Sequence, residues 1–316
     1  MGVEASKVKL KFVRSDGAVL GGIEPTMDNN GGWNVGCGGE WTIPNDGLGN
    51  FANLAYNVET STNILTDGSS LISKRVEETD RTVTMVYGGK NPDRARADAI
   101  AFFNPRFSFE LHAQYRGNTR YCVGELTGFD APAENVHAAP TMTVTLLCMD
   151  PFWRNENGHE EAFGDAKPMF GFPFVSHLRR PRADGSRIPP GFLCGKLVYD
   201  GENSVYNRGD VPCMYRIVCT FKGAVGNPEF IKNDRRVKLI DQYVSGDVLV
   251  IDFEAAPPTV TRNGVNSIQR CTRDSDFVNM AMEVGENTFT YTCDEPETHR
   301  ALMEVQLLYN DRYLGL

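Results

Sequence analysis

The sequence predicts a mainly β-sheet protein built from two domains. Short segments in which apolar and polar residues alternate recur along most of the chain, separated by Gly, Asn, Asp and Pro, which is typical of strands and turns. A chain of 316 residues is long enough for two domains of ordinary size, and 41% hydrophobic residues are enough to fill their cores. From about 154 to 195 the alternation fails, and Gly, Pro and charged residues dominate.

The first half supplies most of a β-rich N-terminal domain. Strands are expected at 8–13, 81–87, 107–115, 120–129 and 141–149. The third and fourth of these should pair as a hairpin through 116–119, because Gly117 and Asn118 can adopt the positive φ angles of a tight turn.

One helix is expected, over residues 92–103. The side chain of Asn91 can cap it, and Pro92 suits the first helical position, where the missing N–H costs nothing. The sequence Asn104-Pro105 ends it. Its apolar stripe is formed by Ala95, Ala99, Phe102 and Phe103.

The second half predicts a β-sandwich. Strands are expected at 214–221, 228–233, 235–241, 247–253, 287–293 and 303–309. Turn residues separate them, such as Asn263-Gly264, and this punctuation of many short strands is typical of a sandwich. The expected division is therefore an N-terminal domain at 1–160, a linker or arm at 161–195 and a C-terminal β-sandwich at 196–316.

The segment 161–195 has two interpretations. It is either a plain connector or an ordered arm that grips a neighbouring subunit. The arm is favoured by a mixture of aromatic and Arg residues, which are enriched at protein interfaces. These residues are Phe170, Phe172, Phe174, Arg179, Arg180 and Arg182.

Composition excludes several classes of partner. The net charge of −9 argues against binding to a phosphate backbone, so we expect no nucleic-acid recognition. No segment approaches the roughly 20 apolar residues that span a bilayer, and the N-terminal residues lack the apolar region of a signal peptide, so we expect cytoplasmic synthesis and no membrane insertion. The eight cysteines include no CxxC pair and no neighbouring His, which favours reduced thiols.

The stretch 146-LLCMDPFWRN-155 offers the first candidate for catalysis, Asp150. It ends an apolar run and precedes Pro151, which cannot donate to a β-ladder. No His or second carboxylate lies at a defined spacing from it. We interpret Asp150-Pro151 as the end of a strand, with the following aromatic residues folding back onto the sheet.

Other candidates are weaker. Asp241, Asp252 and Glu254 could form a carboxylate pair for glycoside hydrolysis, but acids at strand ends are common. His159 lacks the second His of a metal-binding helix, and TRDSDF at 272–277 lacks the rest of a calcium loop.

An exposed aromatic ledge for sugar, from Trp33 and Trp41 or from Tyr206 and Tyr215, is possible, although aromatic residues in sandwiches usually fill the core. No catalytic, cofactor-binding or metal-binding residue is therefore predicted, and no cofactor.

The order of several motifs resembles the distal tail protein family of long-tailed bacteriophages, also called siphovirus tail components. These motifs run through most of residues 70–316. They are DPFW at 150–153, N-x-G-D-x-P at 207–212, G-N-P at 226–228, GD-x-L-x-ID at 246–252 and GEN-x-x-x-Y at 285–291. The match is weaker across 14–66. Physically the motif residues look like turns and strand ends, which suits a scaffold.

The resemblance implies a non-enzymatic structural protein of the virion, placed at the tail tip or baseplate of a phage or prophage-derived particle. It implies a ring, usually of six subunits, made by the N-terminal domain, with a galectin-like C-terminal sandwich projecting outward. The implied partners are the tail tube protein, the tail-associated hub protein and receptor-binding or baseplate proteins. The alternative is a carbohydrate-binding protein with a lectin-like sandwich; a glycoside hydrolase ranks third.

Overall fold

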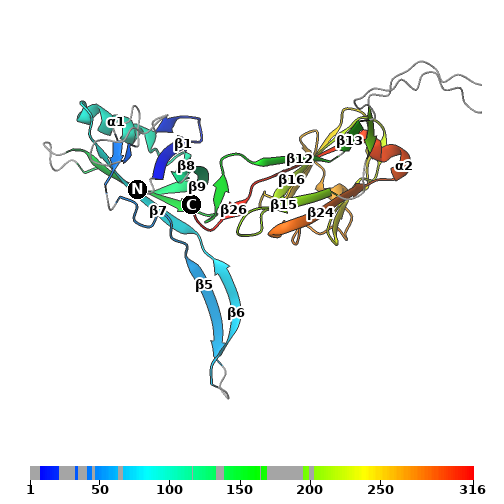
Figure 1. Cartoon of the computed structure of the whole chain (residues 1–316), viewed down its shortest axis with the longest axis horizontal. Coiled ribbons are helices and arrows are strands. Elements are labelled where there is room, and N and C mark those ends of the chain that lie inside the picture. The colour runs from blue at the N-terminus through cyan, green and yellow to red at the C-terminus, as the bar shows by residue number, and fades with distance from the viewer. Residues whose placement is uncertain are drawn as a thin grey trace, which may run out of the picture. The chain divides into compact units, whose positions relative to one another are not determined.

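The computed structural model describes residues 8–20, 33–34, 41–44, 47–62, 67–115, 117–132, 139–163, 165–168, 195–198 and 203–316. These residues are mainly β-sheet, as predicted (Figure 1). The chain divides into two compact units. Unit 1 comprises Met1–Asn157 and Arg312–Leu316, and unit 2 comprises Gly158–Asp311, so the chain passes between the units twice.

Unit 1 is organised by one large antiparallel sheet with the strand order β2-β1-β8-β9-β10-β7-β4-β3. Beyond this path β11 pairs with β9 and with β26, the last strand of the chain. The elements of unit 1 are β1 (Val8–Arg14), β2 (Val19–Leu20), β3 (Trp33–Asn34), β4 (Trp41–Ile43), β5 (Tyr56–Thr62), β6 (Ser69–Val76), β7 (Thr79–Tyr87), α1 (Pro92–Phe102), β8 (Ser108–Tyr115), β9 (Asn118–Asp130), β10 (Thr141–Cys148), β11 (Trp153–Asn155) and β26 (Arg312–Tyr313).

The alternation in the sequence sets which face of this sheet is buried. On β10 every second residue, from Met142 to Cys148, is buried, while the residues between them are half-buried. The hydroxyl of Thr143 lies 3.1 Å from that of Thr84 on β7, so the outer face is linked by side-chain hydrogen bonds. Burying each aliphatic side chain on the inner face stabilises the fold by about 1.5–3 kcal/mol.

Helix α1 packs against the sheet through aromatic rings. Phe102 and the following Phe103 are buried, and the ring of Phe103 lies 5.3 Å from that of Phe12 on β1. The predicted cap differs, because the side chain of Asn91 makes no capping hydrogen bond; its carbonyl accepts one from the N–H of Ala95 instead.

The predicted hairpin is present with a tighter turn. Tyr115 pairs with Asn118, so only residues 116 and 117 separate β8 from β9. Gly117 has a φ of +88°, which a residue with a side chain rarely adopts, whereas Asn118 already belongs to β9.

Unit 2 is a sandwich of two main antiparallel sheets. One has the order β12-β25-β16-β21-β22-β23 and the other β15-β24-β18-β19. The elements are β12 (His159–Phe163), β13 (Asp165–Pro168), β14 (Gly195–Val198), β15 (Asn203–Asn207), β16 (Tyr215–Phe221), β17 (Val225–Gly226), β18 (Glu229–Lys232), β19 (Arg235–Lys238), β20 (Gln242–Tyr243), β21 (Val248–Asp252), β22 (Thr259–Arg262), β23 (Val265–Asn266), η1 (Ile268–Arg270), β24 (Gly285–Thr292), α2 (Pro296–His299), η2 (Arg300–Leu302) and β25 (Met303–Tyr309).

The two sheets of unit 2 share one core. Ile217 on β16 and Leu307 on β25 face Phe230 on β18 and Phe289 on β24, and all four belong to a single buried cluster. The predicted Asn-Gly turn is present between β22 and β23, with positive φ angles of 50° at Asn263 and 79° at Gly264.

The predicted linker or arm at 161–195 falls largely outside the described residues, as do Phe170, Phe172, Phe174, Arg179, Arg180 and Arg182. Two short strands are described at its edges, β13 and β14, and they pair with each other. The boundary at residue 160 and the choice between linker and arm stay predictions.

Asp247 supports a stability prediction in unit 2. It is 7% exposed, and its carboxylate accepts hydrogen bonds from the N–H of Val244 at 2.9 Å, from Asn263 at 2.8 Å and from Arg262 at 2.5 Å. These three hydrogen bonds lower the pKa of Asp247, and the one from Val244 has the largest effect. Asp247→Asn should reduce the free energy of unfolding by about 1–3 kcal/mol.

Because the pKa is lowered in the folded state, this stabilisation is complete above about pH 4 and is lost as the pH falls through the folded-state pKa. Denaturant unfolding followed by circular dichroism at pH 7 and pH 3 tests this, with Asp234→Asn, in an exposed turn, as a neutral control. A gap between wild type and Asp247→Asn that grows on acidification would contradict the expectation.

Candidate assembly interface

Two of the carboxylates considered for glycoside hydrolysis, Asp241 and Asp252, lie beside arginines. Asp252 lies 2.6 Å from Arg216, and its second oxygen accepts a hydrogen bond from the N–H of Glu254 at 2.9 Å. Asp241 lies 3.2 Å from Arg262. Acids held by a cation or by a turn are typical of structural carboxylates.

Asp150 joins the end of β10 to the last strand of unit 1. Its carboxylate lies 2.8 Å from Arg154 on β11 and 3.1 Å from Arg312 on β26. The next residues turn back as expected, since Trp153 is fully buried with its ring 5.3 Å from that of Phe51. The interpretation of Asp150 as a strand end therefore agrees with its surroundings.

His159 and the acidic residues of the segment 272–277 make local ion pairs. His159 lies 2.9 Å from Asp311, Asp274 pairs with Arg236, and Asp276 lies 3.3 Å from Arg235. Over the part of the chain that the structure describes, no three His, Cys, Asp or Glu side chains are placed to hold a metal ion. No described helix is long and apolar enough to cross a membrane.

The proposed aromatic ledges are not assembled. Trp41 and Tyr215 are buried in the two cores, whereas Tyr206 is exposed on β15. The side chain of Trp33 lies outside the described residues. Six cysteines are free thiols, and Cys37 and Cys194 fall outside the described residues.

The motif residues of unit 2 form buried polar networks that fix turns. The amide of Asn207 donates to the carbonyls of Val211 and Met282, both at 3.2 Å. Asn287 donates to the carbonyl of Glu283 at 2.8 Å. Both side chains are fully buried, where an unpaired amide would cost about 1–3 kcal/mol, so these motif positions determine structure.

Among the described residues of unit 1, the β5–β6 hairpin carries a group of exposed apolar side chains. It extends away from the strands of the large sheet (Figure 1), and among the described strands β5 and β6 pair only with each other. A two-stranded sheet with two open edges is marginally stable by itself in water. The sequence expectations did not include this hairpin.

The register of the hairpin separates its side chains into two faces. Residues opposite each other share a face, and the more apolar one carries the pairs Tyr56 with Val76, Val58 with Lys74 and Thr60 with Leu71. Ile72 is the extra residue of a bulge where the register shifts.

The other face of the hairpin is polar and bonded to itself. The hydroxyl of Ser73 donates to Glu59 at 3.0 Å, and the amide of Asn57 donates to Glu77 at 2.8 Å. These polar side chains therefore find hydrogen-bond partners within residues 57–77.

The apolar face is open. Tyr56 is 58% exposed, Val58 51%, Leu71 63% and Ile72 65%. Exposed apolar side chains gathered on one projecting element favour a protein contact, because burying them releases water.

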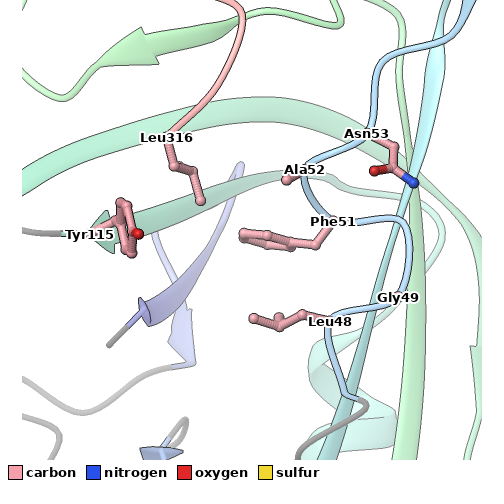
Figure 2. Close-up of a pocket in the computed structure, with 7 residues that line it drawn as sticks. All are labelled: Leu48, Gly49, Phe51, Ala52, Asn53, Tyr115 and Leu316. Atoms are coloured by element: carbon pink, nitrogen blue, oxygen red, sulfur yellow. The ribbon is translucent and has the colours of Figure 1, made fainter. Parts of the chain in front are cut away.

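A cavity of about 360 Å³ lies beside the residues that lead into β5 (Figure 2). Apolar side chains point into it, including those of Leu48, Phe51 and Leu316. Its lining is Leu48, Gly49, Phe51, Ala52, Asn53, Tyr115 and Leu316.

The end of the chain is fixed beside this cavity by Arg120 on β9. The guanidinium of Arg120 lies 3.6 Å from the ring centre of Tyr313 and donates to the carbonyl of Gly315. Unit 1 therefore carries both an apolar projection and an apolar recess.

Comparisons with known proteins relate part of the chain to a family and most of it to solved structures. Residues 208–313 match the family described as the siphovirus-type tail component, C-terminal domain. The resemblance to the distal tail protein family is thereby confirmed.

Two solved structures share the fold along the whole chain. The crystal structure of the SPP1 Dit protein (gp 19.1), described as a paradigm of the hub adsorption apparatus in phages that infect Gram-positive hosts, has a TM-score of 0.59 and 10% identity, over 96% of this chain and 98% of that one. A chain of the phage P2 baseplate in its activated conformation with Ca has a TM-score of 0.51 and 8% identity, over 98% and 100%. The curated proteins include no match.

The ion pairs of Asp150 lead to a prediction for the stability of unit 1. Asp150→Asn and Arg312→Met should each lower the free energy of unfolding by about 1 kcal/mol, because each removes a half-buried charge pair. The double variant should lose less than the sum. Tryptophan fluorescence during denaturant unfolding reports on unit 1, since all three tryptophans lie within residues 1–157. Fully additive losses would show that the two side chains are not coupled.

Proposed function

We propose that this protein is the distal tail protein of a phage or phage-tail-like particle, and that six copies close into a ring at the tail tip or baseplate. The ring would join the tail tube to the tail hub and to receptor-binding or baseplate proteins, and the protein would reside in the virion. The family matched by residues 208–313 supports a place in the phage tail. The fold shared with the SPP1 Dit protein and the P2 baseplate chain supports a place at the distal end of that tail.

The open apolar face of the β5–β6 hairpin is the observation that carries this proposal. A closed ring needs two different contact surfaces on each subunit, because its interfaces are head-to-tail. We assign the hairpin face of Tyr56, Val58, Leu71 and Ile72 as one of them. Complete burial of four such side chains would contribute on the order of 1.5–3 kcal/mol each, before the cost of association is subtracted.

The proposed role is structural and not enzymatic. Asp150, Asp241 and Asp252 are each paired with arginine, and their neighbours form turns or strand ends. A lectin role has less support, since of the four aromatic residues considered for a ledge only Tyr206 is exposed among those whose side chains are described.

The assembly is tested by the solution mass of the full chain, alone and with tail tube protein, from light scattering with negative-stain imaging. We expect a species of about six times the 35.0 kDa subunit with a central hole. A protein that stays monomeric under both conditions would contradict the ring.

The hairpin is tested by Val58→Ser combined with Leu71→Ser. Both side chains are exposed, so the subunit should unfold at the same denaturant concentration while the ring dissociates into subunits. Ser61→Thr with Ser70→Thr, a pair directly opposite each other on the polar face, is the matched control and should leave the ring intact. Rings of normal mass from the Val58 and Leu71 variant would place the contact elsewhere.

A further inference from the structure

Two thiols lie side by side inside the sheet of unit 1. Cys122 is on β9 and Cys148 ends β10, and their side chains are 1% and 0% exposed. The two sulfurs are 3.7 Å apart, which is within hydrogen-bonding distance, and both cysteines are free.

The strand register brings the sulfurs together. Leu147 pairs with Glu125, which sets Cys148 opposite Gly124 and leaves Cys122 as the next residue on the same face of β9. A Cβ at position 124 would lie 3.2 Å from the sulfur of Cys148 and 3.0 Å from the Cβ of Leu146. The absence of a side chain at Gly124 therefore leaves the space through which Cys148 approaches Cys122.

A buried cation flanks the pair on the other side. Arg81 on β7 is opposite Leu146 and is fully buried. Its guanidinium donates to the carbonyl of Pro151 at 2.7 Å and to that of Phe51, and it lies 4.2 Å from the centre of the Trp153 ring. These partners satisfy N–H groups but bring no negative charge.

The electrostatics make the two thiols unequal. The hydrogen bond with Cys122 and the charge of Arg81 lower the pKa of Cys148, against the opposing effects of burial and of Asp150. The pKa of Cys122 is raised by the same hydrogen bond and by burial. The charge of Arg81 therefore favours Cys148 as the nucleophile of the pair.

We propose that Cys122 and Cys148 are a disulfide-forming pair, closed in the folded protein by hydrogen peroxide. The Cys148 thiolate attacks one peroxide oxygen, an S–O bond forms, the O–O bond breaks, and the leaving hydroxide takes up a proton to become water. The sulfur of Cys122 then attacks that of Cys148: the S–S bond forms, the S–O bond breaks, and hydroxide leaves with the Cys122 proton as a second water. Two thiols lose two electrons in total, and the peroxide gains them.

The reaction requires movement of the two sulfurs and entry of a small oxidant. The sulfurs must move from 3.7 Å to the disulfide distance of about 2.0 Å, and peroxide is close to water in size. The product would link β9 to β10 across 26 positions of sequence and so restrict the unfolded chain. The pair would be oxidised when the particle leaves the reducing interior of the host. That event rests on the proposed function, whereas the chemistry of the pair does not.

The experiment uses the folded full chain, treated with hydrogen peroxide, quenched with catalase, then unfolded in alkylating reagent and mapped by mass spectrometry. The expected result is a peptide pair joined through Cys122 and Cys148, reversed by dithiothreitol, as the main cross-link. The oxidised protein should also unfold at a temperature several degrees higher than the reduced protein. This mapping needs no variant, so it decides the question even if a variant folds poorly.

Three variants sharpen the result. Cys148→Ser should abolish the cross-link, and Cys122→Ser should leave a sulfenic acid on Cys148 that dimedone traps. Cys271→Ser, in unit 2, is the control and should leave the cross-link unchanged. The proposal is overturned if Cys122 and Cys148 stay alkylatable after peroxide, if they pair only after the protein is unfolded first, or if peroxide carries Cys148 to the sulfinic acid with no cross-link.

Discussion

Strand β26 pairs with β11 inside unit 1, so the whole of unit 2 is held as an insertion between two strands of one sheet. Arg312 contributes an ion pair with Asp150 to this closure, and Tyr313 accepts a hydrogen bond from Asn155 at 3.2 Å. Within unit 2 the strands next to the two crossings, β12 and β25, pair with each other, and His159 lies 2.9 Å from the fully buried Asp311. Two covalent connections join the units, and paired strands flank these connections in each unit.

The buried faces of both units could be predicted from the sequence, because strict alternation leaves few choices. In β10, Thr143 and Thr145 alternate with Val144 and Leu146, and the structure buries the aliphatic residues as the pattern requires. The Asn263-Gly264 turn was equally determined, since only residues that tolerate positive φ fit there. Local chemistry decides such elements, so local sequence predicts them.

Other features depend on distant parts of the chain. The return of Arg312 to Asp150 joins residues separated by most of unit 2, and no local signal indicates it. Asn91 precedes the helix as expected, yet its backbone carbonyl and not its side chain receives the bond. The β5–β6 hairpin did carry a signal, since Tyr56, Val58, Thr60 and Thr62 alternate as β-formers before the turn residues Asp67-Gly68. The exposure of their face could not be anticipated, because a local pattern does not show whether a strand face is buried.

A scaffold role accounts for where this protein keeps its polar groups. Charged candidates such as Asp252 are bound to arginine, the buried amides of Asn207 and Asn287 fix turns, and one projecting hairpin carries a group of exposed apolar side chains. Covering that hairpin with a second copy is the central claim. Hydrogen–deuterium exchange of residues 56–76, compared between isolated subunits and assembled rings, tests it most directly. The account predicts that exchange in the hairpin slows on assembly, and rings in which the hairpin exchanges as fast as in the subunit would contradict it.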